Sequence, residues 1–273
     1  MKEKIILWFY KIKLPAWINQ ILYKLYLLER NIEGLVKFKD FYFFRCAAIE
    51  ISTYCNRKCA YCPNSVFESP KKLMDFIIFK KAILRLKEIG FSGSLYFHFY
   101  NEPMLDTRLE KLVVYAKKEL PNAMIRIFTN GDYLNIENME ALIKAGVMQF
   151  AISNHTSNRK MFDKRMAIML KKFGKNMEIR YPQEGELSNR GGLVKIEKQD
   201  KRKTCTEPLR TLQIDYLGNV ILCCDDYFRK HKFGNIRKEK LVDIWNKKEF
   251  KKVRQELRLG ITSYDICRKC LCK

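Results

Sequence analysis

The sequence has few acidic residues. Its 273 residues contain 30 aspartates and glutamates against 53 lysines and arginines, which gives a net charge of +23. A field of this sign favours anionic partners. The lysines are scattered, however, and no nucleic-acid-binding motif is present. We therefore interpret the charge mainly as a solvated surface and expect no DNA or RNA partner.

The sequence also lacks a long apolar run and a secretory signal. No apolar segment approaches the ~18 residues that span a bilayer. Residues 5–10 are apolar but lead into Lys11 and Lys13 without a small-residue cleavage site. We therefore expect a cytoplasmic protein. In that compartment the ten cysteines indicate metal ligands rather than disulfides.

A fourth ligand is missing beside three closely spaced cysteines. Cys55, Cys59 and Cys62 follow a C-x3-C-x2-C pattern. Three thiolates leave one iron of a cubane [4Fe–4S] cluster open, and an open position distinguishes a catalytic metal site from a closed structural one. A closed zinc site needs another ligand nearby, and the nearest downstream is His98, so zinc is the weaker interpretation. His98 itself lies in an alternating segment, where a core position is commoner than a ligand contact.

Strands and helices alternate from Cys46 onward. Five apolar runs predict strands, and the segments between them carry helical periodicity. Repeated βα units indicate a parallel sheet whose ligand sites form at the carboxyl ends of the strands. With a sixth strand expected after Gly192, residues 45–198 are predicted to form a partial (βα)6 TIM barrel, an α/β fold. The five runs are 47–52, 95–99, 124–128, 148–153 and 177–181.

Two smaller parts flank the predicted barrel. Residues 1–44 form a basic, aromatic-rich helical extension, for which we favour packing on the barrel over contact with an anionic membrane. Residues 199–273 form a small α+β domain with a predicted β-hairpin at 212–222, whose turn contains Gly218. The cysteines of this domain are Cys205, Cys223, Cys224, Cys267, Cys270 and Cys272.

Both cysteine patterns resemble those of the radical S-adenosylmethionine (SAM) enzymes. The C-x3-C-x2-C loop resembles their cluster motif, and the C-x12-G-x4-C hairpin resembles their C-terminal SPASM/twitch domain. The resemblance implies that SAM binds the open iron and is cleaved reductively to a 5′-deoxyadenosyl radical, which abstracts hydrogen from a substrate. It also implies a flavodoxin- or ferredoxin-type electron donor. One auxiliary [4Fe–4S] cluster is implied, with a tetrathiolate zinc site as the alternative. Its implied ligands are Cys205, Cys223, Cys267 and Cys270, with Cys224 and Cys272 unassigned.

Polar residues at strand ends are expected to bind SAM. Glu102 and Pro103 follow the second strand, where the family has Gly-Gly-Glu or Gly-Glu-Pro, and Asn101 replaces the glycine. Asparagine is a suitable substitute where a positive φ is needed. The carboxylate of Glu102 has the right charge for the SAM ammonium. The resemblance implies SAM contacts from Tyr61, Asn101, Glu102, Thr129, Asn130, Ser153 and Arg190.

The motifs define the radical chemistry more closely than the substrate. Asp225 or Asp226, directly after Cys224, is a candidate general base, and a solvated turn is an equally good interpretation. The cysteine layout is similar to that of aminocyclitol dehydrogenases within the family. This similarity implies oxidation or rearrangement of a sugar-like, hydroxylated small molecule, with the auxiliary cluster as electron acceptor.

Two other classes of function remain as alternatives. The first is radical modification of a ribosomal peptide, by thioether formation, epimerisation or cross-linking. The second is a protein that is not an enzyme, either an iron–sulfur electron carrier or a zinc-dependent nucleic-acid binder. The open three-cysteine site and the Glu102-Pro103 pair argue against both members of the second class.

Overall fold

The computed structural model describes residues 15–41, 43–156, 158–182, 187–196 and 204–271. The chain divides into two compact units, Met1–Phe43 and Phe44–Lys273. Of the predicted cluster ligands, Cys272 lies outside the described residues. None of the helices within the described ranges is long and apolar enough to cross a membrane.

The first unit is built on one long helix, α2 (Ala16–Phe38). It starts directly after Pro15, since proline is well tolerated at the beginning of a helix. It ends where Lys39 adopts a left-handed conformation with φ of 56°, and the N–H groups of Lys39 and Asp40 cap the carbonyls of Leu35 and Gly34, respectively.

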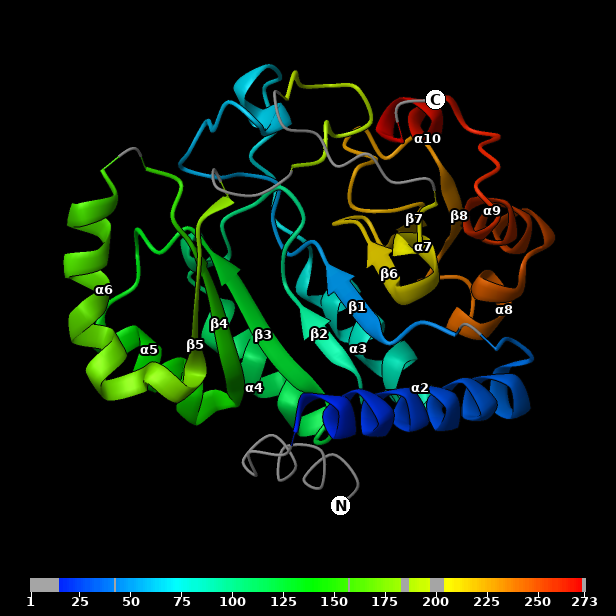
Figure 1. Ribbon diagram of the computed structural model, residues 1–273, viewed down its shortest axis with the longest axis horizontal. Coiled ribbons are helices and arrows are strands. Elements are labelled where there is room, and N and C mark those ends of the chain that lie inside the picture. The colour runs from blue at the N-terminus through cyan, green and yellow to red at the C-terminus, as the bar shows by residue number, and fades with distance from the viewer. Residues whose placement is uncertain (1–14, 42, 157, 183–186, 197–203, 272–273) are drawn as a thin grey trace. The chain divides into compact units, whose positions relative to one another are not determined.

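The second unit contains one eight-stranded sheet in the order β5-β4-β3-β2-β1-β6-β7-β8 (Figure 1). Strands β1 to β6 pair in parallel, and β7 and β8 add an antiparallel edge. The strands are β1 (Cys46–Ile49), β2 (Ser94–Tyr96), β3 (Met124–Thr129), β4 (Val147–Ser153), β5 (Met177–Arg180), β6 (Thr211–Ile214), β7 (Asn219–Ile221) and β8 (Lys232–Asn235).

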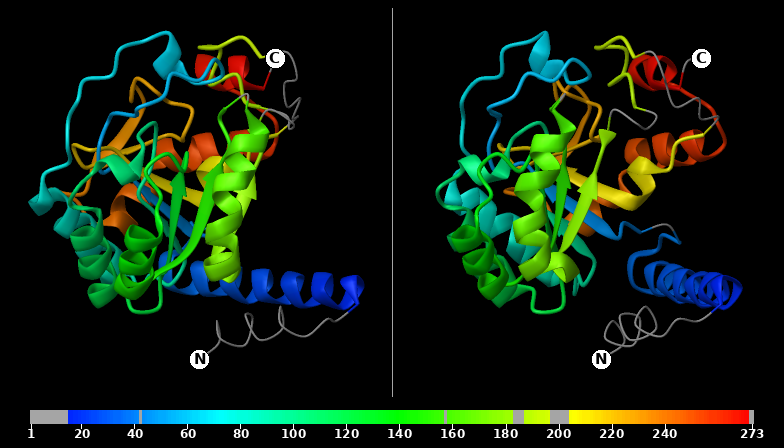
Figure 2. Two further views of the ribbon diagram at one scale, coloured as in Figure 1. Left: turned by 90° about the vertical axis from the view of Figure 1, so that its left-hand side faces the viewer. Right: turned by 60° about the vertical axis from the view of Figure 1, so that its left-hand side comes forward.

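Helices follow the strands as the βα pattern predicts. Helices α3, α4 and α5 lie on one side of the strands, the outer side (Figures 1 and 2). The helices are α3 (Phe76–Glu88), α4 (Leu109–Glu119), α5 (Ile136–Ala145), α6 (Arg159–Phe173), α7 (Glu207–Arg210), α8 (Leu241–Asn246), α9 (Lys248–Arg258) and α10 (Asp265–Cys270), with short 3-10 helices η1 (Pro63–Ser65), η2 (Pro103–Leu105) and η3 (Gly174–Asn176).

The sixth parallel strand is not where the sequence pattern placed it. Residues 188–196 form turns rather than a strand after Gly192. The sixth strand is β6, the first strand of the predicted hairpin, and it pairs with β1 in the register Ala47 to Leu212. The partial (βα)6 fold and the hairpin are therefore both confirmed, but they share a strand, so the sheet continues without interruption into the C-terminal region.

The two faces of the parallel strands differ in burial. In β3, Ile125 and Ile127 are fully buried against the helices, whereas Arg126 and Phe128 on the opposite face are half-buried. We call this opposite side the inner face. It carries Tyr96, Arg126, Phe128, Glu178 and Arg180.

A buried ion pair ties the end of β1 to the C-terminal region. Glu50 is fully buried and accepts hydrogen bonds from the Tyr216 backbone N–H at 3.1 Å and from Arg229 Nε at 3.0 Å. The Arg229 Nη2 atom also contacts Glu50. Burial raises the pKa of Glu50, and Arg229 opposes that shift. Because Arg229 follows Cys223 and Cys224, this pair connects that part of the second cysteine group to the end of β1.

Candidate active site

The three N-terminal cysteines lie at a cavity of about 270 Å³, which we call the barrel cavity. It lies at the carboxyl ends of the strands, where parallel sheets place their ligand sites. The predicted site residues from several strand ends meet on its lining. These are Cys55, Cys59, Tyr61, Cys62, Asn101, Glu102, Thr129, Asn130, Ser153 and Arg190.

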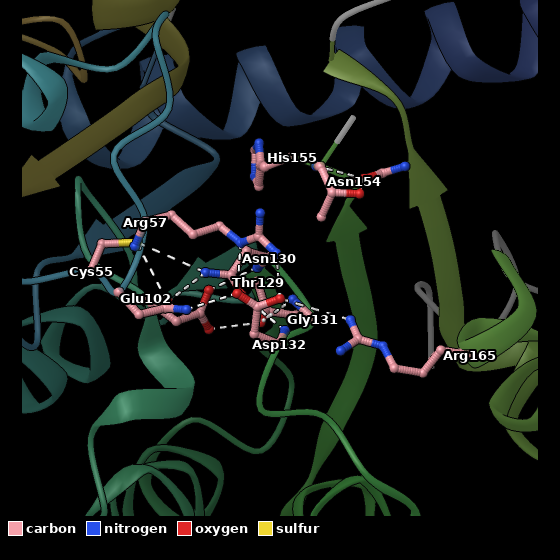
Figure 3. Close-up of polar contacts among 12 residues, drawn as sticks. Cys55, Arg57, Glu102, Thr129, Asn130, Gly131, Asp132, Asn154, His155 and Arg165 are labelled. Atoms are coloured by element: carbon pink, nitrogen blue, oxygen red, sulfur yellow. Dashed lines mark hydrogen bonds and ion pairs between the residues drawn. The ribbon is translucent and has the colours of Figure 1, made fainter. Parts of the chain in front are cut away.

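The cysteine loop is held by a clamp of charged hydrogen bonds (Figure 3). Arg57 donates to both carboxylate oxygens of Asp132, from Nε at 2.6 Å and from Nη2 at 2.5 Å. Asn56 Nδ2 donates to the same carboxylate at 2.7 Å, and Asn130 Nδ2 donates to Asn56 at 2.8 Å. Burial would raise the pKa of Asp132, but the hydrogen bonds and charge of Arg57 outweigh it and hold that pKa below its usual value.

Sequence reasoning missed Asp132. Its partner Arg57 lies inside the cysteine motif, 75 residues earlier. The available signal was the place of Asp132 directly after Thr129-Asn-Gly131, at the same strand end as the predicted SAM contacts. An acidic residue there faces the loop after β1, because the carboxyl ends of parallel strands share one edge.

The Glu102 carboxylate accepts three hydrogen bonds from the protein, which the sequence did not predict. Its Oε1 accepts from the Met104 N–H at 3.1 Å and from Thr129 Oγ1 at 2.7 Å, and its Oε2 accepts from the Asn130 N–H at 2.7 Å. Burial raises the pKa of this carboxyl, and these hydrogen bonds oppose the shift. A carboxylate offers about four acceptor positions. One position on Oε2 therefore remains for a ligand ammonium.

Asn101 does not serve as a left-handed substitute for glycine. Among the described non-glycine residues, a positive φ is found at Lys39, Arg190 and Arg229. The Asn101 side chain instead accepts from the Phe99 N–H at 2.8 Å and donates to the Phe97 carbonyl at 3.3 Å. The expectation of a positive φ was wrong, because an asparagine can close this turn through its side chain.

Tyr61 and His155 form a pair at the rim of the barrel cavity. The Tyr61 hydroxyl is hydrogen-bonded to His155 Nδ1, and both side chains line the cavity. Burial lowers the pKa of His155 to about 4, and the charge of Arg57 adds to that effect. His155 is therefore neutral near pH 7. The pair holds the tyrosine ring on the cavity lining, where the resemblance implied a SAM contact.

The second cysteine group gathers around another cavity, of about 250 Å³, which we call the C-terminal cavity. Its lining includes Cys205, Cys223, Cys224, Cys267 and Cys270. The structure thus brings together every described cysteine that the sequence assigned to this group.

Two residues line both cavities, Arg190 and Cys224. Arg190 Nη1 lies 3.1 Å from Asp225 Oδ1, and its guanidinium lies 5.9 Å from the Tyr100 ring centroid. Asp225 Oδ2 accepts from Ser188 Oγ at 2.6 Å and lies 3.3 Å from Cys270 Sγ. The two cavities therefore share a wall that is made of polar groups.

Asp226 is not on either cavity lining. Its buried carboxylate accepts from the Lys230 N–H at 3.1 Å and the His231 N–H at 2.8 Å, and lies 3.3 Å from His231 Nδ1. These contacts close the turn after the cysteine pair. Of the two candidate bases, the structure brings only Asp225 to a cavity.

The donor set of both cavities fits iron–sulfur clusters. Burial, followed by the charge of a neighbour, raises the pKa of Cys267 and of Cys270 to about 12. Burial likewise raises the pKa of Cys55 to about 11. Thiolates in such surroundings need compensating positive charge, which metal ions supply. Among the described side chains, no three or more His, Cys, Asp or Glu residues surround a single ion position. A cubane cluster binds its cysteines one per iron.

Fold and cavities together fit an iron–sulfur enzyme whose catalytic cluster would lie at the strand ends of a partial barrel. Comparison with known families assigns it further. Residues 49–178 match the radical SAM superfamily, and residues 205–271 match SPASM, an iron–sulfur cluster-binding domain. The chain belongs to the radical SAM superfamily, and the predicted resemblance is confirmed.

Similar proteins cover most of the chain. An S-adenosyl-L-methionine-dependent 2-deoxy-scyllo-inosamine dehydrogenase of Niallia circulans is 31% identical over 234 residues, which are 83% of this chain and 92% of that protein. A crystal structure of BtrN in complex with AdoMet and 2-DOIA has a TM-score of 0.75 at 30% identity, over 84% of this chain and 93% of that chain. BtrN in an open conformation has a TM-score of 0.67 at 27% identity, over 84% of this chain and 92% of that chain.

The family assigns the cofactors. The protein is an enzyme that binds SAM and a [4Fe–4S] cluster in its barrel and auxiliary iron–sulfur in its C-terminal region. Bound SAM supplies a 5′-deoxyadenosyl radical when it is cleaved reductively. The chain's own contribution is to present Cys55, Cys59 and Cys62 on a clamped loop and to surround them with strand-end polar groups.

Proposed function

We propose that this enzyme oxidises a hydroxyl group of a sugar-like small molecule to a carbonyl. The observation that carries the proposal is the wall shared by the two cavities, where Arg190 and Cys224 contact both and the Asp225 carboxylate lies beside them. A substrate in the barrel cavity at this wall would lie between the site of radical formation and the auxiliary cluster. The similarity to a dehydrogenase of a hydroxylated ring supports this class of reaction.

The proposed reaction removes two hydrogens from one carbinol. The hydrogen atom on carbon passes to the 5′-deoxyadenosyl radical, the hydroxyl proton passes to the Asp225 carboxylate, and the remaining electron passes to the auxiliary cluster. Asp225 suits the role of base because its carboxylate contacts Arg190 of the shared wall and is oriented by Ser188 and Arg190. Asp226 instead supports the turn that presents the cysteines.

The auxiliary ligands and SAM contacts complete the proposal. We assign the auxiliary cluster to Cys205, Cys223, Cys267 and Cys270, which leaves Cys224 on the shared wall. For SAM, the open acceptor position on Glu102 suits the ammonium, and Tyr61 and Ser153 contribute from the lining. Asn101, Thr129 and Asn130 shape this pocket mainly by holding Glu102 and the adjacent turns.

Anaerobic reconstitution tests the two-cluster assignment. We expect about eight irons per chain, and 5′-deoxyadenosine on reduction with SAM. The triple variant Cys55→Ala/Cys59→Ala/Cys62→Ala should retain about four irons and form no 5′-deoxyadenosine. Two zinc ions per chain and no SAM cleavage would refute the proposal.

A matched pair of variants tests the base. With hydroxylated rings as substrates, including 2-deoxy-scyllo-inosamine, the carbonyl product is trapped as an oxime and identified by mass spectrometry. Asp225→Asn should lower carbonyl formation by about 10²-fold or more while 5′-deoxyadenosine still forms. Asp226→Asn should lower thermal stability and leave the ratio of carbonyl to 5′-deoxyadenosine unchanged. An unchanged ratio in Asp225→Asn contradicts its role as base.

We also propose the setting in which the enzyme works. Reduced clusters suit the cytoplasm and a flavodoxin- or ferredoxin-type donor. Three parts of the chain divide the work: an extension (1–44), the barrel (45–198) and the auxiliary-cluster domain (199–273). The separate matches of residues 49–178 and 205–271 to the radical SAM and SPASM families support the division between the last two parts.

Peripheral membrane contact is proposed for the extension. Within its own unit, α2 leaves one apolar stripe exposed, and the chain carries a net charge of +23, which suits an anionic surface. The full chain should cosediment with phosphatidylglycerol vesicles but not with phosphatidylcholine vesicles, and Leu25→Asp/Leu28→Asp should abolish the binding. Equal binding by this variant would refute the contact. The stripe consists of Trp17, Ile21, Leu25, Leu28, Ile32 and Leu35.

A further inference from the structure

The inner face of the barrel carries charges where a closed barrel is filled with branched apolar side chains. Arg126 on β3 and Arg180 on β5 converge on a single carboxylate, that of Glu178. Arg126 Nη2 lies 2.8 Å from Glu178 Oε2, and Arg180 lies 2.7 Å (Nε) and 2.6 Å (Nη2) from Glu178 Oε1. Two guanidinium groups thus share one carboxylate, so this cluster of described side chains has a net charge of +1.

Phe128 connects this charged group to the barrel cavity. Both guanidiniums lie over its ring, Arg126 at 5.5 Å and Arg180 at 5.0 Å from the centroid. The same ring lines the cavity and packs against His98, with centroids 4.4 Å apart. Side-chain exposure is 23% for Arg126 and 39% for Arg180, so both charges are partly accessible beside Phe128, although neither side chain is on the cavity lining itself.

Three buried polar atoms on the cavity lining have no hydrogen-bond partner in the described structure. They are His98 Nδ1, Tyr100 Oη and Arg190 Nε. The sequence pattern favoured a core role for His98, whereas the structure places it on this lining. Leaving such an atom unpaired costs about 1–3 kcal/mol. Three of them around one cavity indicate a ligand that supplies their partners, and hydroxyl groups, which both donate and accept, match all three.

The electrostatic field at this lining is positive. Burial lowers the pKa of His98 to about 4, and the charges of Arg180, Arg190 and Arg126 each lower it further. Among the described residues, the acidic groups near this lining are Glu178 and Asp225, which each contact an arginine, and Glu102, which accepts from Thr129 and the Asn130 N–H. A neutral imidazole therefore offers a hydrogen bond, while the surrounding field favours a negatively charged ligand.

We propose that the substrate is an anionic polyol: its hydroxyl groups bind His98, Tyr100 and Arg190, and a phosphate or carboxylate group faces Arg126 and Arg180. This inference rests on the proposed function, since it places the substrate in the barrel cavity. It departs from a simple transfer of the relative's substrate, because an amine-bearing ring would meet a field of its own sign.

Binding of four hexoses to the SAM-loaded, reconstituted enzyme tests the charge preference. Glucosamine, glucose, glucuronate and glucose 6-phosphate share one ring and carry a positive charge, no charge, a carboxylate and a phosphate. Isothermal titration calorimetry should show glucuronate or glucose 6-phosphate binding about tenfold more tightly than glucose, and glucosamine most weakly. The two anions distinguish a carboxylate from a phosphate substrate. Raising the ionic strength from about 0.05 to about 0.5 M should remove most of the difference.

Variants test recognition of the anionic group and recognition of the hydroxyl groups separately. Arg126→Gln and Arg180→Gln should each abolish most of the anion preference. Tyr100→Phe should weaken all four ligands alike. The matched control is Arg159→Gln, an arginine on α6 that also has a carboxylate partner, Asp163 at 3.5 Å, and an aromatic ring at 4.0 Å, and it should change nothing.

The outcomes distinguish this inference from the proposed function. Equal binding of all four hexoses, no detectable binding of any of them, or an anion preference that survives Arg126→Gln and Arg180→Gln overturns the inference. Each of these results is compatible with 5′-deoxyadenosine formation and carbonyl products. Absence of SAM cleavage with two clusters loaded would instead refute the proposed function.

Discussion

Replacing Asp132 with asparagine should loosen the cluster loop without unfolding the barrel. Three hydrogen bonds from Arg57 and Asn56 converge on this carboxylate at 2.5 to 2.7 Å. Asp132→Asn removes the charge and replaces one acceptor oxygen with an NH2 group. That group can accept from neither Arg57 nor Asn56, so at least one donor of the clamp loses its partner.

The magnitude follows from the partial burial of the clamp. The side chains of Arg57 and Asp132 are each 22% exposed. Hydrogen bonds to charged groups contribute about 1.5–3 kcal/mol when buried, whereas exposed ion pairs contribute about 0–1 kcal/mol. An intermediate loss of about 1–2 kcal/mol corresponds to a roughly 5- to 30-fold larger population of the undocked loop. Since the loop carries Cys55, Cys59 and Cys62, we expect the barrel cluster to lose iron faster by that factor.

Iron release to a chelator measures this effect under anaerobic conditions. The reconstituted enzyme should show two phases of about four irons each. Asp132→Asn should accelerate only the phase of the barrel cluster, so the auxiliary cluster serves as an internal reference. Arg57→Lys, which keeps the charge but loses the two-pronged geometry, should have an intermediate effect.

A surface pair provides the matched control. Glu140 pairs with Lys172, and both side chains are about half exposed, at 50% and 48%. Glu140→Gln should therefore leave iron release unchanged. If Asp132→Asn released iron at the wild-type rate, or if Glu140→Gln accelerated release equally, the clamp would not be what positions the loop.

Three further outcomes follow from the buried carboxylates. Glu50→Gln leaves Arg229 without its charged partner and should lower the free energy of unfolding by about 3–5 kcal/mol in urea titrations. Glu102→Gln places an NH2 group against the donors of Thr129 and Asn130, and should cost about 1–3 kcal/mol and weaken SAM binding in calorimetry. Burial raises the pKa of both carboxyls, so the folded state binds their protons more tightly than the unfolded state. Their contribution to stability should therefore be complete below pH 4.5 and fall as pH rises through the raised pKa values. Either substitution should make the free energy of unfolding depend less steeply on pH over this range.

The sequence predicted the parts of the site that depend on local pattern. Alternating apolar runs placed five strands, and the spacing of Cys55, Cys59 and Cys62 indicated the open cluster. Polar residues after the strands had to meet, because the carboxyl ends of parallel strands share one edge. The barrel cavity confirms that Glu102 and Thr129 come together.

Pairings between distant segments were not predictable in this way. β6 is four residues long, and its apolar pattern suits a hairpin strand and a sixth barrel strand equally well. Only its register with β1 distinguishes them. Likewise nothing local indicates that Arg57 pairs with Asp132. The role of His98 depends on whether side chains fill the inner face of the barrel or leave a cavity there. The local sequence around His98 does not determine this.

The turn that presents Arg190 explains how two cavities come to share a wall. Arg190, Gly191 and Gly192 are consecutive residues with φ of 54°, 65° and 85°. Glycine tolerates this conformation, but for arginine it costs about 1–3 kcal/mol and persists only where surrounding contacts maintain it. A Cβ on Gly191 would lie 2.5 Å from Cγ1 of Ile266 on α10.

The absence of that Cβ allows the turn to pack closely on the helix that carries Cys267 and Cys270. The Asp225 contact at 3.1 Å then holds the arginine side chain at the wall. The same close packing therefore positions the auxiliary cysteines and the residue that contacts both cavities. A shift of α10 would move both together, so the proposed electron acceptance and substrate contact would be geometrically coupled.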